Sequence, residues 1–113
     1  MSDLQISVES MKRVELVTVS GRIDSSSAPQ LDETLKGLME NGRYKMVIEL
    51  SGVNYMSSAA LRVLVSAVRE CKSHRGNVKL ANVSDRVNEV LKLAGLDAIF
   101  EVFDDKTAAV GSF

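Results

Sequence analysis

The chain has 113 residues, 45% of them hydrophobic, and a formal net charge of −1, as expected for one globular domain with its own core. The near-neutral net charge does not indicate direct binding of nucleic acid or of an anionic membrane. The single cysteine, Cys71, excludes an internal disulfide framework. No signal sequence or apolar run of membrane-spanning length is present, so we expect one domain over residues 1–113 in the cytoplasm.

The first part of the chain predicts a strand hairpin followed by a helix. Apolar residues alternate with polar ones from Leu4 to Val8, and residues 14–19 follow as an antiparallel partner strand. The serines before Pro29 then begin a helix whose leucines repeat at helical spacing. Asn41-Gly42 ends this helix.

The second part alternates strands and helices. A strand over residues 44–50 leads through a glycine-containing loop to a helix that begins near Ser58 or Ala59 and ends at residues 74–76. The expected elements after it are a strand over 78–81, a helix from Ser84 to Gly95, a strand over 99–103 and a short helix capped by Asp104. This alternation predicts an α/β fold with a mostly parallel sheet and about four helices.

Two predicted loops follow the carboxyl ends of strands, residues 24–28 and residues 53–58. The carboxyl ends of parallel strands share one edge of a sheet, where open α/β folds bind their ligands. If the two strands are neighbours, Asp24 and Ser58 lie close together at that edge.

The serine pair Ser57-Ser58 opens the second helix and has two interpretations. The first is an ordinary helix N-cap, which taken alone is the more common use of serine at such a place. The second is a serine that carries a phosphate, because the positive end of a helix dipole tolerates a negative group. The flanking residues, Tyr55, Met56, Ala59 and Ala60, would leave a hydroxyl approachable. A phosphate adds about −1.5 to −2 charge and would penalise an apolar or acidic partner without unfolding the domain.

Catalysis by these serines is not expected. The only histidine, His74, lies about 20 Å from Ser58 at the far end of the predicted helix, so it cannot act as the base. Neither a nucleophile elbow nor a glycine-rich phosphate loop is present, and Cys71 is interpreted as a core residue. We therefore expect no enzyme activity, no cofactor and no metal site. A third hypothesis, a flavodoxin-like enzyme that binds a nucleotide, is the weakest for the same reasons.

Four segments resemble bacterial anti-sigma factor antagonists of the STAS domain family. They are Gly21–Asp24, Val47–Leu50, Tyr55–Leu64 and Val87–Leu96, the last of which closes with Leu93-Ala94-Gly95-Leu96. The resemblance extends in the same order over essentially the whole chain, and the family's fold agrees with the predicted pattern.

The resemblance implies a cycle of partner switching. The unphosphorylated antagonist binds an anti-sigma factor that is also a serine kinase and thereby frees the sigma factor. The kinase phosphorylates the antagonist, which breaks the complex, and a phosphatase of the protein phosphatase 2C type reverses the modification. In the family motif, the phosphate acceptor is the serine three residues before the leucine that corresponds to Leu61, so the resemblance implies that Ser58 is the acceptor. Asp24 matches a family aspartate that contributes to partner contact.

This sequence departs from the family pattern at two positions. Many members have aspartate where Ser57 stands, so this chain lacks that charge and Ser57 becomes a competing acceptor. Alanine at position 60 replaces a frequent glycine.

The resulting predicted partner surface comprises Asp24, Ser25, Ser26, Ser27, Tyr55, Met56, Ser57, Ser58, Ala59, Ala60 and Arg62. For residues 25–27, a capping loop is the simpler interpretation. The alternative function is a STAS scaffold subunit of a stress-signalling or transport complex, in which the serines only cap the helix.

Overall fold

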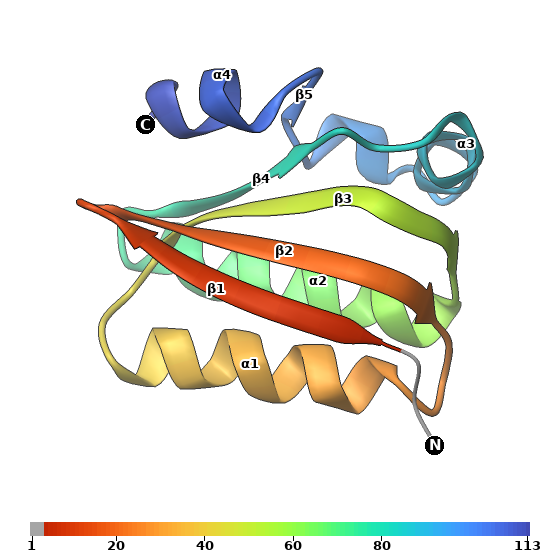
Figure 1. Ribbon diagram of the computed structural model, residues 1–113, viewed down its shortest axis with the longest axis horizontal. Helices are drawn as coiled ribbons and strands as arrows, with labels where there is room; N and C mark the ends of the chain where they lie inside the picture. The colour runs from red at the N-terminus through yellow and green to blue at the C-terminus, as the bar shows by residue number, and fades with distance from the viewer. Residues whose placement is uncertain (1–3) are drawn as a thin grey trace.

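The computed structural model of the protein describes residues 4–113, so residues 1–3 of the expected domain lie outside the described part. Within that part the chain forms one five-stranded sheet and four α-helices (Figure 1). The elements are β1 (Gln5–Met11), β2 (Val14–Ile23), α1 (Ala28–Glu40), β3 (Lys45–Met56), α2 (Ser58–Ser73), β4 (Asn77–Ala81), α3 (Asp85–Leu93), the 3₁₀ turn η1 (Leu96–Ala98), β5 (Val102–Phe103) and α4 (Lys106–Gly111).

The strands lie in the order β1-β2-β3-β4-β5. β1 and β2 pair antiparallel, whereas every other neighbouring pair is parallel. Figure 1 shows α1 and α2 on one face of the sheet and α4 on the other. The expectation of an α/β fold with an N-terminal hairpin and an otherwise parallel sheet is confirmed.

The main core lies between the sheet and the helices α1 and α2. Alternate residues of β2 and β3 point into it, among them Val17, Val19, Met46 and Ile48, each completely buried. They meet the apolar faces of the two helices, which present Leu31, Leu35, Leu64, Val68 and Cys71. A smaller cluster beneath α4 is formed by Val14, Leu16, Val47, Ala81 and Ala109. Because α4 has only six residues, it covers only part of its face of the sheet.

The expected ends of two strands were wrong. β2 continues to Ile23 rather than ending at Val19, and β3 continues to Met56 rather than Leu50, so most of the predicted loop 53–58 is strand. The polar and glycine residues that interrupt the apolar pattern lie on the partly covered face. The strands stay paired there through register shifts between Thr18 and Ser20 and between Gly21 and Arg22. Close packing there requires Gly52, since a Cβ atom would stand 2.9 Å from the Cβ of Ser20. Because β3 extends to Met56, Ser57 is the single residue between β3 and α2.

Two expectations near the C-terminus also need correction. The last strand is Val102–Phe103 rather than residues 99–103, because the chain before it forms η1 and a turn after Gly95, whose φ is +74°. Asp105, not Asp104, caps α4, and its Oδ1 accepts a hydrogen bond of 2.8 Å from the amide of Ala108.

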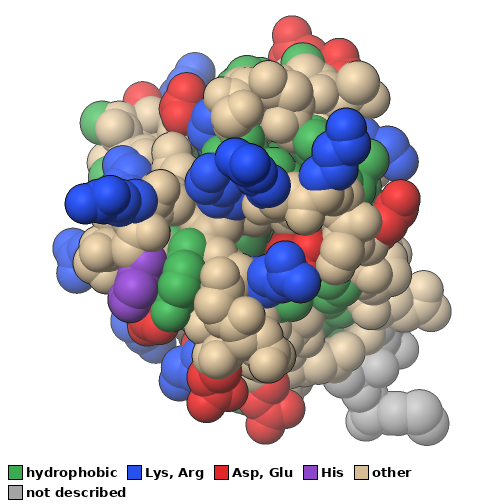
Figure 2. Space-filling view, turned by 90° about the vertical axis from the view of Figure 1, so that its left-hand side faces the viewer, with side chains coloured by type: hydrophobic (Ala, Val, Ile, Leu, Met, Phe, Trp, Pro, Cys, Tyr) green, Lys and Arg blue, Asp and Glu red, His purple; other side chains and the backbone are tan. Residues whose placement is uncertain are grey.

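Cationic side chains gather at the end of the molecule where the parallel strands begin (Figure 2). They come from the β1–β2 turn, the segment before β3 and the first residue of β3, and they include Lys12, Arg13, Arg43 and Lys45. At the same end, the ring of His74 stacks on Tyr44 with 4.0 Å between the centroids. This charge therefore lies at the opposite end of α2 from the serine pair.

Candidate functional site at the start of helix α2

Ser57 and Ser58 occupy different positions at the start of α2. Ser57 is the N-cap: its backbone is extended, and its Oγ accepts a hydrogen bond of 3.2 Å from the amide of Ala60. Its carbonyl accepts a further bond of 3.0 Å from the amide of Leu61. The capping interpretation is therefore confirmed for Ser57.

Ser58 is the first residue of the helix, and its side chain is exposed. Its hydroxyl has no hydrogen-bond partner among residues 4–113. The hydroxyl faces solvent at the end of the helix where the backbone dipole is positive. Ser58 is thus the member of the pair that can change chemically without loss of the cap.

The two predicted loops meet as expected. The amide of Ser57 donates a hydrogen bond of 2.8 Å to the carbonyl of Ile23, and Ile23 pairs with Met56 in the sheet register. Because Asp24 follows Ile23 and Ser58 follows Ser57, this bond brings Asp24 and Ser58 to the same edge of the sheet.

Asp24 organises its own loop through one carboxylate oxygen. Its Oδ1 accepts hydrogen bonds from the Ser26 hydroxyl at 2.7 Å and from the amides of Ser26 and Ser27 at 3.0 Å each. The hydrogen bond from the Ser26 hydroxyl and those from the two amides lower the pKa of Asp24 from 3.8 to about 2. The other oxygen, Oδ2, lies 3.9 Å from Nε of Arg22. The carboxylate is therefore ionised at physiological pH, and Oδ2 is the atom that it can offer to a partner.

The predicted partner surface divides into accessible and buried residues. Exposed side chains belong to Ser25, Ser26, Tyr55, Ser58 and Arg62, and half-buried ones to Asp24, Ser57 and Ala59. Ser27, Met56 and Ala60 are 3%, 4% and 0% exposed, and Met56 and Ala60 belong to the core beneath α1 and α2. Ser27 donates its hydroxyl to the carbonyl of Arg22 at 2.7 Å. These three residues support the site from below and present no side-chain surface to a partner.

Tyr55 extends the site onto the other face of β3. Its neighbour Met56 points into the core, so the alternation of the strand directs Tyr55 outward, where its side chain is 40% exposed. The guanidinium of Arg22 lies 4.0 Å from the centroid of the Tyr55 ring, a cation–π contact. Arg22 thus lies between the Tyr55 ring and the Asp24 carboxylate.

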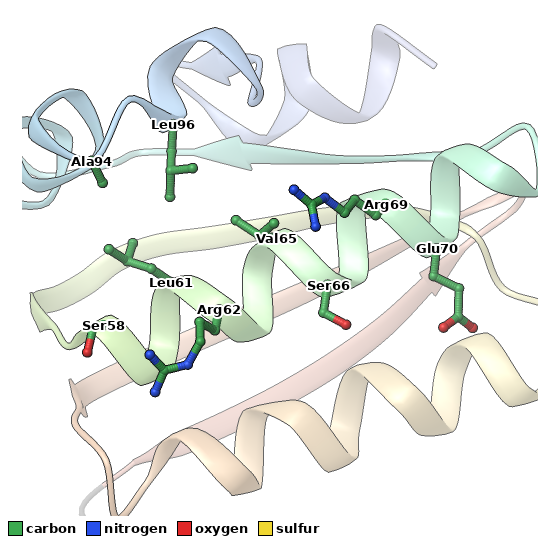
Figure 3. A pocket seen from close by; sticks show the side chains of 9 residues that line it. All are labelled: Ser58, Leu61, Arg62, Val65, Ser66, Arg69, Glu70, Ala94 and Leu96. Carbon is green, nitrogen blue, oxygen red and sulfur yellow. The ribbon is translucent and has the colours of Figure 1, made fainter.

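A groove runs along α2 from Ser58, between this helix and the segment after α3 (Figure 3). Its volume is about 760 Å³. The lining residues are Ser58, Leu61, Arg62, Val65, Ser66, Arg69, Glu70, Ala94 and Leu96. Figure 3 shows Leu61 and Val65 facing Ala94 and Leu96 across the groove. Leu61 and Val65 pack against the core but are only half-buried. The sequence analysis did not predict this groove, although the apolar stripe on α2 is wider than its contact with the sheet requires.

The histidine and the cysteine considered in the sequence analysis, His74 and Cys71, lie toward the end of α2 opposite the serine pair. His74 is exposed at the C-terminus of α2, with Nδ1 3.0 Å from the carbonyl oxygen of Glu70. Cys71 is completely buried, and burial raises the pKa of its thiol to about 11. Residues 4–113 hold no group of three or more histidine, cysteine or acidic side chains placed to bind a metal ion. No helix in that range is long and apolar enough to cross a membrane.

Comparison with known proteins identifies the family. Residues 5–109 match the STAS domain, so the chain belongs to the STAS domain family. It is 37% identical over 86 residues to the anti-sigma-B factor antagonist of Bacillus subtilis, a match that covers 76% of this chain and 78% of the relative.

Solved structures confirm the fold. An anti-sigma factor antagonist from Mycobacterium paratuberculosis superposes with a TM-score of 0.88 at 24% identity, over 99% of this chain and 97% of that one. The Bacillus cell fate determinant SpoIIAA in its phosphorylated form superposes with a TM-score of 0.77 at 16% identity, over 96% and 98%. The expected family and fold are therefore confirmed. Regulators of this class are not enzymes, which agrees with the expectation that the chain has no catalytic activity.

Proposed function

We propose that the protein is an anti-sigma factor antagonist whose binding is controlled by phosphorylation of Ser58. In its unphosphorylated form it binds an anti-sigma factor that is also a serine kinase, and so frees the sigma factor. The observation that carries the proposal is the exposed, unbonded hydroxyl of Ser58 at the edge that also holds Asp24. The relatedness to an anti-sigma-B factor antagonist supports it.

The choice of Ser58 over Ser57 rests on their hydrogen bonds. Modification of Ser57 would remove the hydrogen bond that the amide of Ala60 donates to its Oγ, and so weaken the start of α2. Modification of Ser58 leaves that cap in place. The kinase would form a bond between Oγ of Ser58 and the γ-phosphorus of ATP, with release of ADP and the hydroxyl proton.

A phosphate at Ser58 would act on binding rather than on folding. It would place about −1.5 to −2 charge at one end of an apolar groove, on the same sheet edge as Asp24, which is ionised at physiological pH. A partner surface complementary to the unmodified site, whether apolar or acidic, would lose affinity. The core beneath is closed by buried residues that the phosphate does not touch. Hydrolysis of the phosphoserine by a phosphatase of the protein phosphatase 2C type would restore binding.

The test begins with the protein purified from its source cells. Phosphate is mapped by peptide mass spectrometry, and proteins that co-purify are identified in parallel. The affinity of the recovered kinase-type partner is then measured for the parent, Ser58→Ala and Ser58→Glu, with Thr34→Glu as a control. Thr34 lies on α1, where its hydroxyl bonds the carbonyl of Gln30 away from the site.

We expect phosphate on Ser58, near-parental affinity for Ser58→Ala, and at least tenfold weaker binding for Ser58→Glu. Thr34→Glu should bind like the parent. Equal affinity of the Ala and Glu variants, or a serine pair that is never modified during growth and stress, would replace the proposal with the scaffold function. In that case, a co-purifying partner without kinase character should be found.

A further inference from the structure

Arg62 is an exposed cation one helical turn after Ser58. It has no ion pair or hydrogen bond with another residue of the range 4–113. Both residues line the mouth of the groove, and Figure 3 shows their side chains on the same side of α2. A phosphate on Ser58 would therefore find an uncommitted guanidinium within its reach.

The other nearby cations are less suited to this role. Arg22 already contacts the Tyr55 ring and the Asp24 carboxylate. Arg69 also lines the groove but stands eleven residues after Ser58, about 16 Å along the helix axis. Of these three cations, Arg62 is the one that is close to Ser58 along the helix and has no ion pair or hydrogen bond with a described residue.

The spacing of Ser58 and Arg62 favours a pair within the helix. Side chains four residues apart lie about 5–6 Å apart at Cβ, and an acidic group N-terminal to a basic one is the better orientation. The planar guanidinium can donate two parallel hydrogen bonds to two phosphate oxygens, whereas an ammonium acts as a point charge. The amides of Ser58 and Ala59, which bond no described residue, reinforce the positive field there.

We propose that Arg62 binds the phosphate of phosphoserine 58 within the same molecule and so holds the modified state. The inference rests on the proposed function. It assigns Arg62 two alternative positions, one on the rim of the groove and one folded back over the phosphate. Phosphorylation then alters the partner surface twice, by adding negative charge and by withdrawing the cation that the partner would meet.

The test uses full-length protein with phosphoserine incorporated at position 58 during translation, which needs no kinase. The second pKa of the phosphate, near 6 for a free phosphoserine, is measured by ³¹P NMR titration. The variants are Arg62→Gln, Arg62→Lys and, as a matched control on the same helix, Arg69→Gln. Circular dichroism of the unphosphorylated forms checks that each variant folds.

We expect Arg62→Gln to raise the pKa of the phosphate by about half a unit, because a bound guanidinium favours the dianion. Arg62→Lys should recover part of the shift, and Arg69→Gln should change it by less than about 0.1 unit. Identical pKa values for the parent and Arg62→Gln would overturn the inference. This outcome is separate from failure of the proposed function, which would appear as unmodified Ser58 in cells or as partner binding that ignores the phosphate.

Discussion

The amide of Ser57 and the carbonyl of Ile23 form a hydrogen bond of 2.8 Å that joins the end of β2 to the start of α2. It brings the carboxylate of Asp24, which follows β2, and the hydroxyl of Ser58, at the start of α2, to the same edge of the sheet. Asp24 and Ser58 are 34 positions apart in the chain, and the parallel pairing of β2 with β3 brings their two segments together. The site is therefore a property of the sheet rather than of either loop.

Replacing Ser57 with alanine should lower the free energy of unfolding by about 1 kcal/mol, since it removes the cap of α2. Ser58→Ala should change it by less than about 0.5 kcal/mol, because that hydroxyl bonds no described residue. Urea denaturation of both variants measures the difference. Equal losses in the two would contradict the assignment of Ser57 as the cap.

Asp24→Asn should lower the urea midpoint at pH 7, because the Oδ1 atom then receives its hydrogen bonds as a neutral amide oxygen. The pKa of Asp24 is depressed in the folded state, so its contribution is present above the unfolded value of 3.8. That contribution is lost as the pH falls through about 2. Urea midpoints measured from pH 7 to pH 2 should therefore converge for parent and variant at the acid end. A gap at pH 2 as large as the gap at pH 7 would show that the effect is not one of ionisation.

Gly76 and Gly37 offer a matched pair of substitutions to alanine. A Cβ at Gly76 would stand 1.8 Å from the carbonyl oxygen of Tyr44, so the backbone must move, and we expect a loss of about 3 kcal/mol or more. Gly37 lies inside α1 with nothing within 4 Å of the added atom, and the change should stabilise by about 0.5–1 kcal/mol. Thermal unfolding of the two variants gives the comparison. A stable Gly76→Ala protein would show that the Tyr44 contact is not close.

Cys71 should resist thiol reagents in the folded protein. Its side chain is fully buried, and at pH 8 a thiol with a pKa of about 11 is ionised in roughly one molecule in a thousand. Reaction with a disulfide reagent should be slow in buffer and fast in denaturant. Since the chain has a single cysteine, total absorbance reports this site alone. Rapid reaction in buffer would indicate that α2 opens away from the core.

The alternation of apolar patterns in the sequence predicted the order of elements, the N-terminal hairpin and the meeting of the two loops at one sheet edge. The ends of β2 and β3 could not be predicted in this way. Ser20, Ser51 and Asn54 lie on a face that α4 covers only in part, and polar residues on such a face do not mark the end of a strand. Resemblance to the family motif placed Met56 and Ala60 on the predicted partner surface. Both are buried in the structure, because burial within a motif depends on how the helices pack over it. The groove was missed for a related reason: its second wall, Ala94 and Leu96, comes from a segment about thirty residues away in the chain.

The direct passage from β3 into α2, with Ser57 alone between them, restricts how an enzyme can reach Ser58. The hydroxyl belongs to the first turn of a helix packed on the core and not to a pliable loop that could be drawn as an extended strand into an active-site cleft. A kinase must accordingly read the folded surface as a unit. A synthetic peptide covering residues 50–64 should then be a poor substrate, even though it contains every residue around the acceptor.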